Sequence, residues 1–531
     1  MSARLRSLVI PGLLCLAAVP LAAQDTPRPP SAAAVRRAVE TITEADVRSR
    51  IAIIADDSMR GRDTPSPELD ETAAWIASEF QRFGLRPGGD SGSFLQRYRI
   101  RRTQFDTASF VLAMGRGATS RLRIGRDAGW LEGEPPESAL TAPLVLMAGT
   151  PADSARPFGA VQVRGAIVVL AVPGAQFLAL QRSLQNVVRR GMQEGVRGWL
   201  LLTGTPTPPL LAQLVRSASR VRSEVVGMGA GPARALVPPI LLARDSAMLE
   251  TLRAAGEDLA TLFTPAAAGI RALPGFTVTI SVRRNLLSEA TAPNVVGILE
   301  GSDPQLRSEA VVFSGHMDHV GVGRPVNGDS IFNGADDDAS GTIGVVELAE
   351  AFAALTPRPR RSLVFLTVSG EEHGLWGSGF YAQHPAIPLA ATVADLNIDM
   401  IGRYFENRPG WRDTIAVIGK EHSTLGATAN RVTQQHPELR MQLVDDMWPS
   451  ENFYFRSDHI HFARGGVPIL FFFNGTHPDY HGAGDSVDRI DAEKAARIVR
   501  MVFYIGLEVA NTTARPEWNP ESRRRIVQGA N

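Results

Sequence analysis

The chain has 531 residues, which is more than a single hydrophobic core usually serves, so two domains are expected. Its 44% apolar and 21% charged residues are typical of a globular protein with an ordinary buried core. The 55 basic and 55 acidic residues cancel, so the net charge gives no reason to expect nucleic acid or an anionic membrane as a partner.

The first 23 residues have the layout of a secretory signal peptide. Arg4 and Arg6 precede an apolar run over residues 8–18, and small residues follow it. The run is too short for a comfortable membrane span, so we expect export to the periplasm or the extracellular space without a membrane anchor. The only cysteine, Cys15, lies within this segment. The mature chain would therefore have no disulfide, no thiolate nucleophile and no cysteine-ligated zinc.

The first part of a larger domain is predicted over residues 34–140. Within it, Ile76, Phe80 and Phe83 belong to a helical pattern that indicates one buried face. Over residues 141–266 the pattern changes to short strands and helices that are bracketed by proline and glycine clusters. We interpret this segment as a separate small α/β module that is inserted into the larger domain.

The larger domain is predicted to resume over residues 275–513, before a C-terminal tail over residues 514–531. Short apolar runs alternate here with helical segments, such as the pattern over residues 343–355. Continuous apolar runs of this length are typical of strands in a sheet that is covered on both faces. The predicted fold class is therefore an α/β three-layer sandwich with a largely parallel mixed sheet.

Histidine and carboxylate side chains follow the apolar runs of this domain, at the points where the predicted strands end. Ligands of open α/β sheets bind beyond the carboxyl ends of the strands, so we expect these side chains at one edge. In chain order they are His316 and Asp318, the segment NGADDDASG at 333–341, Glu371 and Glu372, Asp399, and His481. An apolar core does not account for so many polar groups at one edge.

Imidazole and carboxylate groups without thiolates fit a divalent cation, with zinc first and manganese or cobalt as alternatives. The carboxylates outnumber the ligands that one catalytic zinc ion needs. Two ions that share a bridging aspartate explain the excess, because such a bridge holds them about 3.5–4 Å apart. Nearby cations also explain why three aspartates stand side by side at 336–338, where like charges otherwise repel each other.

The ordered motifs GHMDH, NGADDDASG, SGEEHGLWGS, NIDMIGR, SDHIHF and DYH resemble metallopeptidase family 28. This family contains the secreted co-catalytic zinc aminopeptidases and the relatives of glutamate carboxypeptidase II. The resemblance extends over most of the chain, because the segment SMRGRDTPSPELDETAAWIASEFQRFGLRPGG is similar to the opening of the same family. The insert resembles a protease-associated domain, although its pattern is looser.

The resemblance implies that five residues of this chain hold two zinc ions. One ion would be completed by His316 and Asp399, the other by Glu372 and His481, and Asp337 would bridge them. The flanking residues Asp336 and Asp338 would instead shape the turn or the start of the following helix.

The same resemblance implies roles for three further residues. Asp318 would accept the second N–H group of the His316 imidazole and thereby fix its tautomer. Glu371 would be the general base that takes a proton from water and passes it to the leaving amine. Tyr480 would donate to the oxyanion, by analogy with the carboxypeptidase branch of the family.

The other histidines are interpreted as surface or hydrogen-bonded side chains. His477 competes with His481 for the last ligand position, since both lie in the segment HPDYH, and His481 is favoured. The histidines without a predicted role in the site are His319, His373, His384, His422, His436, His459 and His461.

The motifs favour a zinc-dependent exopeptidase that removes N-terminal residues from peptides, with a carboxypeptidase or dipeptidase of the same family as the alternative. Two further alternatives are a glutaminyl cyclase with one zinc ion and a receptor ectodomain without metals. The complete ligand set speaks against both, and the protease-associated-like insert speaks against the cyclase. The sequence has no GxSxG, HExxH or Walker motif, so serine hydrolases, single-helix zinc proteases and P-loop enzymes lack support.

Overall fold

The structure is a computed structural model that describes residues 29–529, except 117, 134–135, 137, 150–156, 173–180, 204–207, 229–236, 265–267 and 405–409. The predicted signal peptide, including Cys15, lies outside the described residues. Among the helices of the described ranges, none has the length and apolarity that crossing a bilayer requires.

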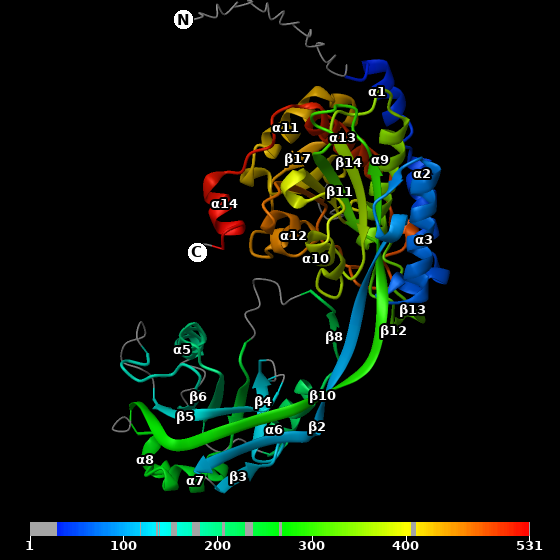
Figure 1. Ribbon diagram of the computed structural model, residues 1–531. Helices are drawn as coiled ribbons and strands as arrows, with labels where there is room; N and C mark the ends of the chain where they lie inside the picture. The colour runs from blue at the N-terminus through cyan, green and yellow to red at the C-terminus, as the bar shows by residue number, and fades with distance from the viewer. Residues whose placement is uncertain are drawn as a thin grey trace, which may run out of the picture.

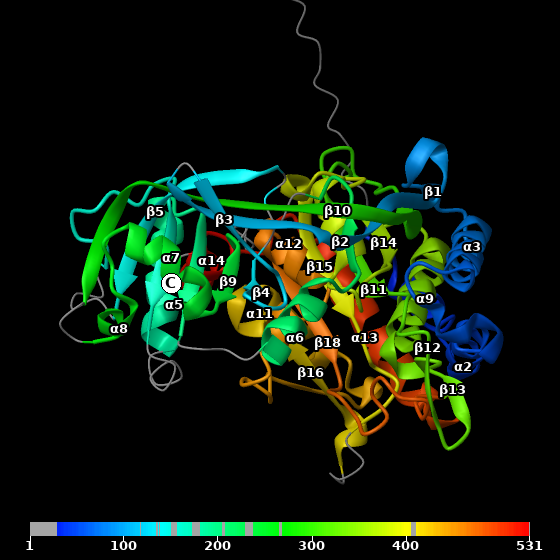
Figure 2. The same cartoon turned by 90° about the horizontal axis from the view of Figure 1, so that it is seen from below.

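The chain forms a larger and a smaller α/β domain that are joined by two long strands (Figure 1). These strands are β2 (Leu95–Arg116) and β10 (Gly269–Leu299). They pair antiparallel from Leu95 and Val295 in the larger domain to Gly115 and Thr277 in the smaller one. The view from below shows the same two strands running from one domain into the other (Figure 2).

The larger domain is built on a mixed sheet whose centre is parallel. Its strands, in spatial order, are β17 (Gln442–Val444), β16 (Thr414–Ile418), β18 (Ile469–Phe473), β15 (Thr392–Ile398), β11 (Ala310–His316), β14 (Ser362–Val368) and the end of β10. Strand β11 pairs parallel with both β14 and β15, and β15 pairs parallel with β18. All residues of these four strands are buried, as the continuous apolar runs of the sequence predict.

Helices cover both faces of this sheet. One face carries α1 (Ala32–Val39), α2 (Glu44–Ile54), α3 (Pro67–Arg82), α9 (Gly341–Ala354), α11 (Leu425–Gln435) and α13 (Ala492–Asn511). The other face carries α10 (Trp376–Gln383) and α12 (His459–Arg464). Alternate residues of β11 point into the two cores, with Val311 and Phe313 in the first and Ala310 and Val312 in the second. The predicted three-layer α/β sandwich is therefore confirmed.

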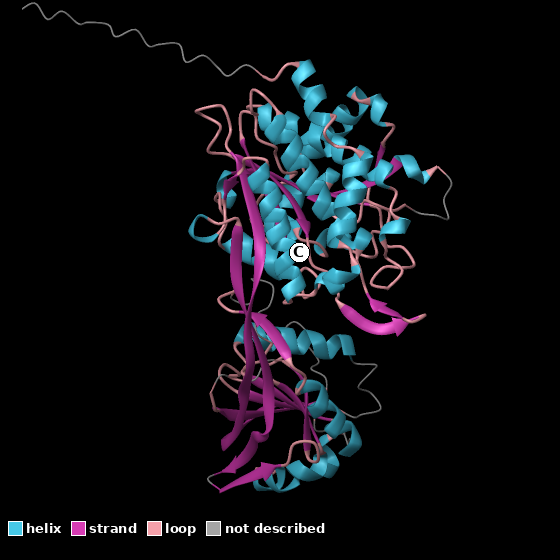
Figure 3. Ribbon diagram, turned by 90° about the vertical axis from the view of Figure 1, so that its right-hand side faces the viewer, coloured by secondary structure: helices cyan, strands magenta, loops and turns pink. Residues whose placement is uncertain are grey.

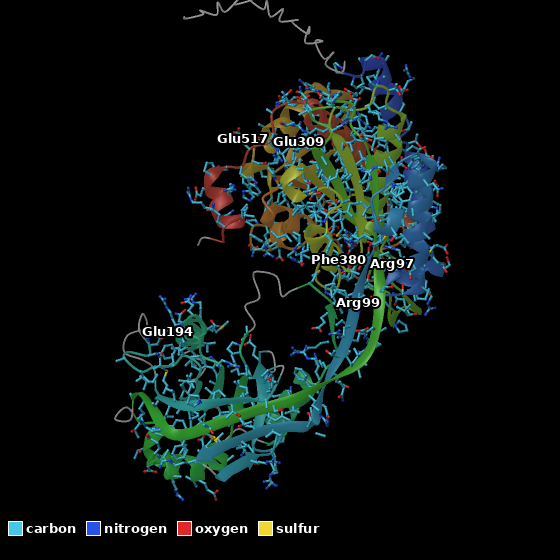
Figure 4. The ribbon with its side chains drawn as sticks, in the orientation of Figure 1. Arg97, Arg99, Glu194, Glu309, Phe380 and Glu517 are labelled. Carbon is cyan, nitrogen blue, oxygen red and sulfur yellow. The ribbon has the colours of Figure 1, made fainter. Side chains whose placement is uncertain are left out.

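Helix α3 illustrates how local sequence specifies these elements. The Ser66 hydroxyl accepts the Leu69 N–H at 3.0 Å, and Pro67 occupies the first turn, where its missing N–H costs nothing. Ile76 and Phe80 are fully buried on the face that the sequence predicted, whereas Phe83 follows the helix as its C-cap and is partly buried. Figure 4 shows Arg97 and Arg99 on β2 as it leaves the larger domain, and the Arg97 guanidinium donates to Asp70 of α3 at 2.9 Å.

The smaller domain is a second α/β unit with its own cores. Its sheet contains β5 (Leu140–Ala148), β6 (Ile167–Ala171), β7 (Gly198–Leu202), β9 (Ile240–Ala243) and β4 (Ala128–Glu132), and the first four of these strands run parallel. Its helices are α5 (Gln181–Glu194), α6 (Pro208–Ala218), α7 (Asp245–Ala254) and α8 (Leu259–Leu262). Figure 3 shows this unit apart from the helix-rich larger domain.

The core of the smaller domain begins earlier and ends later than the predicted insert over residues 141–266. Phe105 and Leu112 of β2 and Val278 and Ile280 of β10 all lie in it. The short strands β3 (Ala118–Leu122) and β8 (Arg222–Val225) pair with β2, while β1 (Arg86–Pro87) pairs with β10. The boundary between the two domains therefore lies within β2 and β10, because each of these strands contributes side chains to both cores.

Two smaller features complete the fold. An exposed hairpin of β12 (Val322–Val326) and β13 (Asp329–Ile331) lies between β11 and α9 in the chain. The predicted C-terminal tail contains a helix, α14 (Pro520–Ile526), whose Ile526 is buried. The Trp518 indole donates to the Gly466 carbonyl at 2.8 Å, so this segment packs on the larger domain and is not a free tail. The three arginines at 523–525 are exposed, as predicted.

Candidate metal centre

The carboxyl ends of the central strands bring the predicted site residues together. His316 is the last residue of β11, Asp399 directly follows β15, and Glu371 and Glu372 follow β14 by three and four residues. Asp337 lies in η4 (Ala335–Ser340), a short turn of π-helix that leads into α9. Parallel strands place these segments at one edge of the sheet.

The first group of donor atoms consists of His316, Asp337 and Asp399, all of them buried. His316 Nε2 lies 3.3 Å from Asp337 Oδ1 and 3.7 Å from Asp399 Oδ1. The second Asp399 oxygen accepts the Ser457 hydroxyl at 2.8 Å, which fixes the orientation of the carboxylate. These three side chains were predicted as ligands, and they converge on one point.

The second group lies on the other side of Asp337. His481 Nε2 is 3.2 Å from Asp337 Oδ2 and 3.0 Å from Glu372 Oε2. His319, which was predicted to have no role in the site, also lies here, with Nδ1 3.1 Å from Glu372 Oε1. His319, Asp337 and Glu372 offer donor atoms that all lie within 4.8 Å of one another.

Several of these atoms have no hydrogen-bond partner, although they are buried. They are Asp337 Oδ2, Glu372 Oε1 and both ring nitrogens of His319. Buried carboxylate oxygens without a partner are costly unless a cation compensates them. Donor atoms around a tetrahedral zinc ion lie about 3.3–3.6 Å apart, and most separations in both groups are close to that range. The residues therefore fit divalent cations, with one oxygen of Asp337 facing each group.

The pKa of His481 reflects the same excess of negative charge. Burial favours the neutral imidazole, but the carboxylates of Asp337 and Glu372 raise the pKa of His481 to about 10. Without a metal ion, a proton on the histidine supplies the positive charge that these two carboxylates require. A bound cation would take over this role.

The two aspartates that flank Asp337 hold the backbone, as predicted. Asp338 accepts the main-chain N–H groups of His316 at 3.1 Å, Gly341 at 2.9 Å and Met400 at 3.0 Å. Asp336 accepts the N–H group of Gly402 at 2.6 Å. Asp338 thereby connects η4 to the ends of β11 and β15, and Asp336 connects it to the segment that follows β15.

Two further residues support the centre and were not identified in the sequence. Asp485 accepts the main-chain N–H groups of Asp336 and Asp337 at 2.9 and 3.0 Å. Arg62 is fully buried, and its guanidinium donates to the carbonyls of Met317, Ile54, Asn333 and Gly334. Burial lowers the pKa of Arg62 to about 10, against the opposing effect of nearby carboxylates, so the side chain keeps its positive charge at neutral pH.

Asp318 contacts His316 differently from the prediction. His316 Nδ1 lies 3.2 Å from the main-chain carbonyl of Asp318 and 3.7 Å from its carboxylate. The carboxylate instead accepts the Thr64 hydroxyl at 3.0 Å and the Glu371 N–H at 3.3 Å. The carbonyl therefore fixes the imidazole tautomer, and the carboxylate holds the loop that carries Glu371.

A small cavity opens beside the first donor group. It is lined by His316, Asp337, Glu371, Asp399, Met400, Phe453, Arg456, Ser457, Phe471, Phe473, Thr476 and Tyr480. Burial raises the pKa of Glu371 well above its usual value, and the charge of a nearby cation would lower it again. Burial also raises the pKa of Tyr480, so its phenol remains a hydrogen-bond donor. Both residues thus face the same space as the ligands.

His477 does not belong to either donor group. Its Nε2 lies 3.4 Å from Asp336 and 4.0 Å from Asp485, so it contacts the turn behind the ligands. The geometry therefore agrees with the choice of His481 over His477 as the candidate ligand. Apart from His319, the histidines without a predicted role are absent from both donor groups within the described residues.

Comparison with known proteins agrees with this geometry. Residues 294–506, which include all five predicted ligands, match the model of Peptidase family M28. The resemblance to family M28 is confirmed. The matched segment runs from the last part of β10 through α13, so it covers the second part of the larger domain and leaves out the smaller one.

Individual relatives match parts of the chain. A protein of Pyricularia oryzae named "Probable zinc metalloprotease" is 36% identical over 162 residues, which are 30% of this chain and 30% of the relative. Leucine aminopeptidase 2 of Arthroderma otae is 25% identical over 275 residues, covering 47% of this chain and 51% of the relative. The chain thus matches about a third to a half of the length of these curated relatives.

One similar solved structure is an aminopeptidase from Aneurinibacillus sp. strain AM-1. It is 18% identical, the match covers 91% of this chain and 97% of that one, and the TM-score is 0.47.

Proposed function

We propose that the protein is an exported zinc-dependent aminopeptidase that hydrolyses N-terminal residues from peptides. The observation that supports this best is the position of Asp337, whose two oxygens face separate groups of imidazole and carboxylate donors. Two Zn²⁺ ions, with Mn²⁺ or Co²⁺ as substitutes, would occupy these groups. The family match and the relative named leucine aminopeptidase support the same activity.

Each proposed ion has its own set of ligands. His316 and Asp399 would hold the first ion, and Glu372 and His481 would hold the second, while Asp337 would bridge them. The charges support this arrangement, because three carboxylates and one hydroxide balance two divalent ions. Without cations, the buried carboxylates would repel one another.

The side chains around the cavity suggest how the reaction proceeds. Bound divalent ions would lower the pKa of a water molecule and polarise the carbonyl of the scissile peptide bond. Glu371 would take a proton from the attacking water and deliver it to the leaving amine. Tyr480 would donate its phenol hydrogen to the oxygen of the attacked carbonyl.

The lining of the cavity favours an N-terminal residue with an apolar side chain. Phe453 and Phe473 provide apolar surface, and the carboxylates of Glu371 and Asp399 would attract a terminal ammonium group. Arg456 is the cation among the described lining residues, and its guanidinium lies 3.4 Å from Glu451. A substrate carboxylate would have to compete with Glu451 for this contact.

Export and the identity of the smaller domain belong to the same proposal. The arginines and the apolar run of the first 23 residues support export, and the parallel α/β unit at the end of β2 and β10 would be the protease-associated-like domain. We expect this domain to shield the cavity or to select peptides at its entrance.

A panel of chromogenic substrates tests the activity. We expect hydrolysis of leucyl-p-nitroanilide, no hydrolysis of its N-acetyl derivative, and loss of activity with a chelator that added zinc restores. Cleavage of only acyl-blocked peptides with a free carboxyl terminus would contradict the aminopeptidase and favour the carboxypeptidase alternative. Full activity in the chelator would contradict a metallopeptidase altogether.

A further inference from the structure

His319 is a buried histidine whose position is not explained by hydrogen bonding within the protein. It follows His316 by three residues, and its side chain is completely shielded from solvent. Its main-chain N–H donates to the Arg62 carbonyl at 3.3 Å, which fixes the backbone at this point. Neither ring nitrogen has a hydrogen-bond partner in the described residues. A buried imidazole normally satisfies at least one nitrogen, so this ring lacks an expected ligand.

The Nδ1 atom of His319 faces the second donor group. His319 Nδ1 lies 3.1 Å from Glu372 Oε1 and 3.7 Å from Asp337 Oδ2. Glu372 Oε1 and Asp337 Oδ2 are themselves buried without a hydrogen-bond partner. The imidazole of His481 faces the same place, edge to face with His319 at 5.6 Å between ring centroids. Donor atoms of His319, Asp337 and Glu372 thus all lie within 4.8 Å of one another, and His481 Nε2 lies 3.2 Å from the same Asp337 oxygen.

The backbone of Gly334 makes room for this ring. Gly334 has a φ of +59°, and a Cβ atom at this position would lie 2.5 Å from His319 Cγ and 2.3 Å from the Asp337 carbonyl oxygen. Only glycine fits such a close approach without a shift of the turn. The segment that carries the bridging aspartate is thus shaped around the His319 imidazole.

We propose that His319 is a direct ligand of the second metal ion, together with Asp337, Glu372 and His481. This inference rests on the proposed two-metal centre and makes that centre asymmetric. The second ion would have four protein ligands, as closed zinc sites do, whereas the first would have three and keep a position open.

The position of the cavity supports the same division between the ions. Its lining contains the ligands of the first site, His316, Asp337 and Asp399, but not His319, Glu372 or His481. Substrate would therefore meet the first ion, and the second ion would hold Asp337 and the surrounding loops in place.

The alternative role for His319 is to orient Glu372 from outside the coordination sphere. Crystals of the wild-type protein grown with zinc distinguish the two roles through the anomalous signal of the metal. We expect His319 Nδ1 at about 2.0–2.1 Å from the second ion. A distance above about 3 Å with both ions present would overturn the inference and leave the proposed function intact. A protein without zinc at saturation would instead contradict the proposed function itself.

Zinc titration of a His319→Ala variant adds a readout that does not depend on activity. Loss of a residue that only orients a ligand typically weakens metal binding about 10–100-fold. We expect the affinity for one of the two ions to fall more than 100-fold, and the affinity for the other to stay within tenfold of wild type. The control is His373→Ala, because His373 lies nearby but contacts Asp63 at 2.8 Å, and we expect this variant to bind both ions normally.

A folded His319→Ala variant that binds both ions within tenfold of wild type would overturn the inference. If that variant does not fold, the distance in the wild-type crystals decides.

Discussion

The carboxylate of Asp485 accepts the main-chain N–H of Asp337 at 3.0 Å. Asp485 follows His481 by four residues, so the loop that supplies one candidate ligand also fixes the backbone of the proposed bridging residue. The same carboxylate accepts the N–H of Asp336 and is completely buried. The position of Asp337 thus depends on a residue that does not face the metal centre.

An Asp485→Asn variant should be less stable than the wild type and should bind zinc less tightly. Asp485 makes three contacts with the main-chain N–H groups of Asp336 and Asp337, whereas asparagine leaves one oxygen to accept both groups. Its amide NH₂ would then face at least one of these donors, at a cost of about 1–3 kcal/mol. We expect the free energy of unfolding to fall by this amount. We also expect the affinity for zinc to fall about 10–100-fold. Asp488→Asn is the matched control, since Asp488 is exposed on the same loop. Equal stability and affinity in the two variants would contradict the supporting role of Asp485.

A Glu371→Gln variant should retain its metal ions but lose most of its turnover. Glu371 lines the cavity but belongs to neither donor group, so glutamine removes the proton acceptor and spares the ligands. We expect kcat to fall by about 10²–10⁴-fold at unchanged zinc content. Glu517→Gln is the control, because Glu517 is exposed and is not among the residues that line the cavity. A kcat near the wild-type value would exclude Glu371 as the base.

Arg50 connects α2 to α9 through the buried carboxyl of Glu347 and the partly exposed one of Glu350, and its removal should destabilise the fold. Its guanidinium lies 2.5 Å from Glu347 and 2.5 Å from Glu350, and Glu347 is completely buried. Burial raises the pKa of Glu347 to about 8, so in Arg50→Met this carboxyl would take up a proton and lose its hydrogen-bond partner Arg50, which we expect to cost about 1–3 kcal/mol in chemical denaturation. Arg82→Met removes a more exposed guanidinium that pairs with Glu79 and should cost less than about 1 kcal/mol. Similar losses in both variants would refute this interpretation.

His459 should make the fold less stable in acid. Burial lowers the pKa of His459 to about 3, although its Nε2 lies 2.8 Å from the Tyr454 carbonyl, an interaction that partly offsets burial. The unfolded chain, with a histidine pKa of about 6.5, binds a proton that the folded chain rejects. The stability that depends on a neutral His459 is therefore fully present above pH 6.5 and is lost as the pH falls from 6.5 towards 3.

A His459→Gln variant tests this linkage, since glutamine can still donate to the Tyr454 carbonyl. We expect the free energy of unfolding to depend less steeply on pH between 4 and 6, by up to about 1.4 kcal/mol per pH unit. Identical slopes for wild type and variant would show that His459 does not titrate in this way.

The central sheet could be predicted from sequence because its strands are short, continuously apolar and covered on both faces. Strands β11 and β14 follow this rule over their whole length. The boundary of the smaller domain could not be predicted in the same way. Strands β2 and β10 continue without interruption from one core into the other, so no turn marks the change, and Phe105 and Val282 belong to the smaller core.

The candidate ligands could be predicted because each of them follows a strand or lies in a polar turn with its own pattern. His319 could not, because a single histidine carries no periodic signal, although its distance of three residues from His316 was a usable hint. Arg62 and Asp485 were missed for another reason. Their contacts with the turn before α9 span 271 and 149 residues of sequence, so only the folded chain brings them together.

The bridging position of Asp337 is the central claim, and anomalous diffraction at the zinc absorption edge tests it most directly. In crystals saturated with zinc, we predict two peaks about 3.5–4 Å apart, one on each side of the Asp337 carboxylate. Each peak should lie within about 2.0–2.2 Å of one Asp337 oxygen. A single peak at full saturation, or two peaks that are not joined by Asp337, would contradict the account.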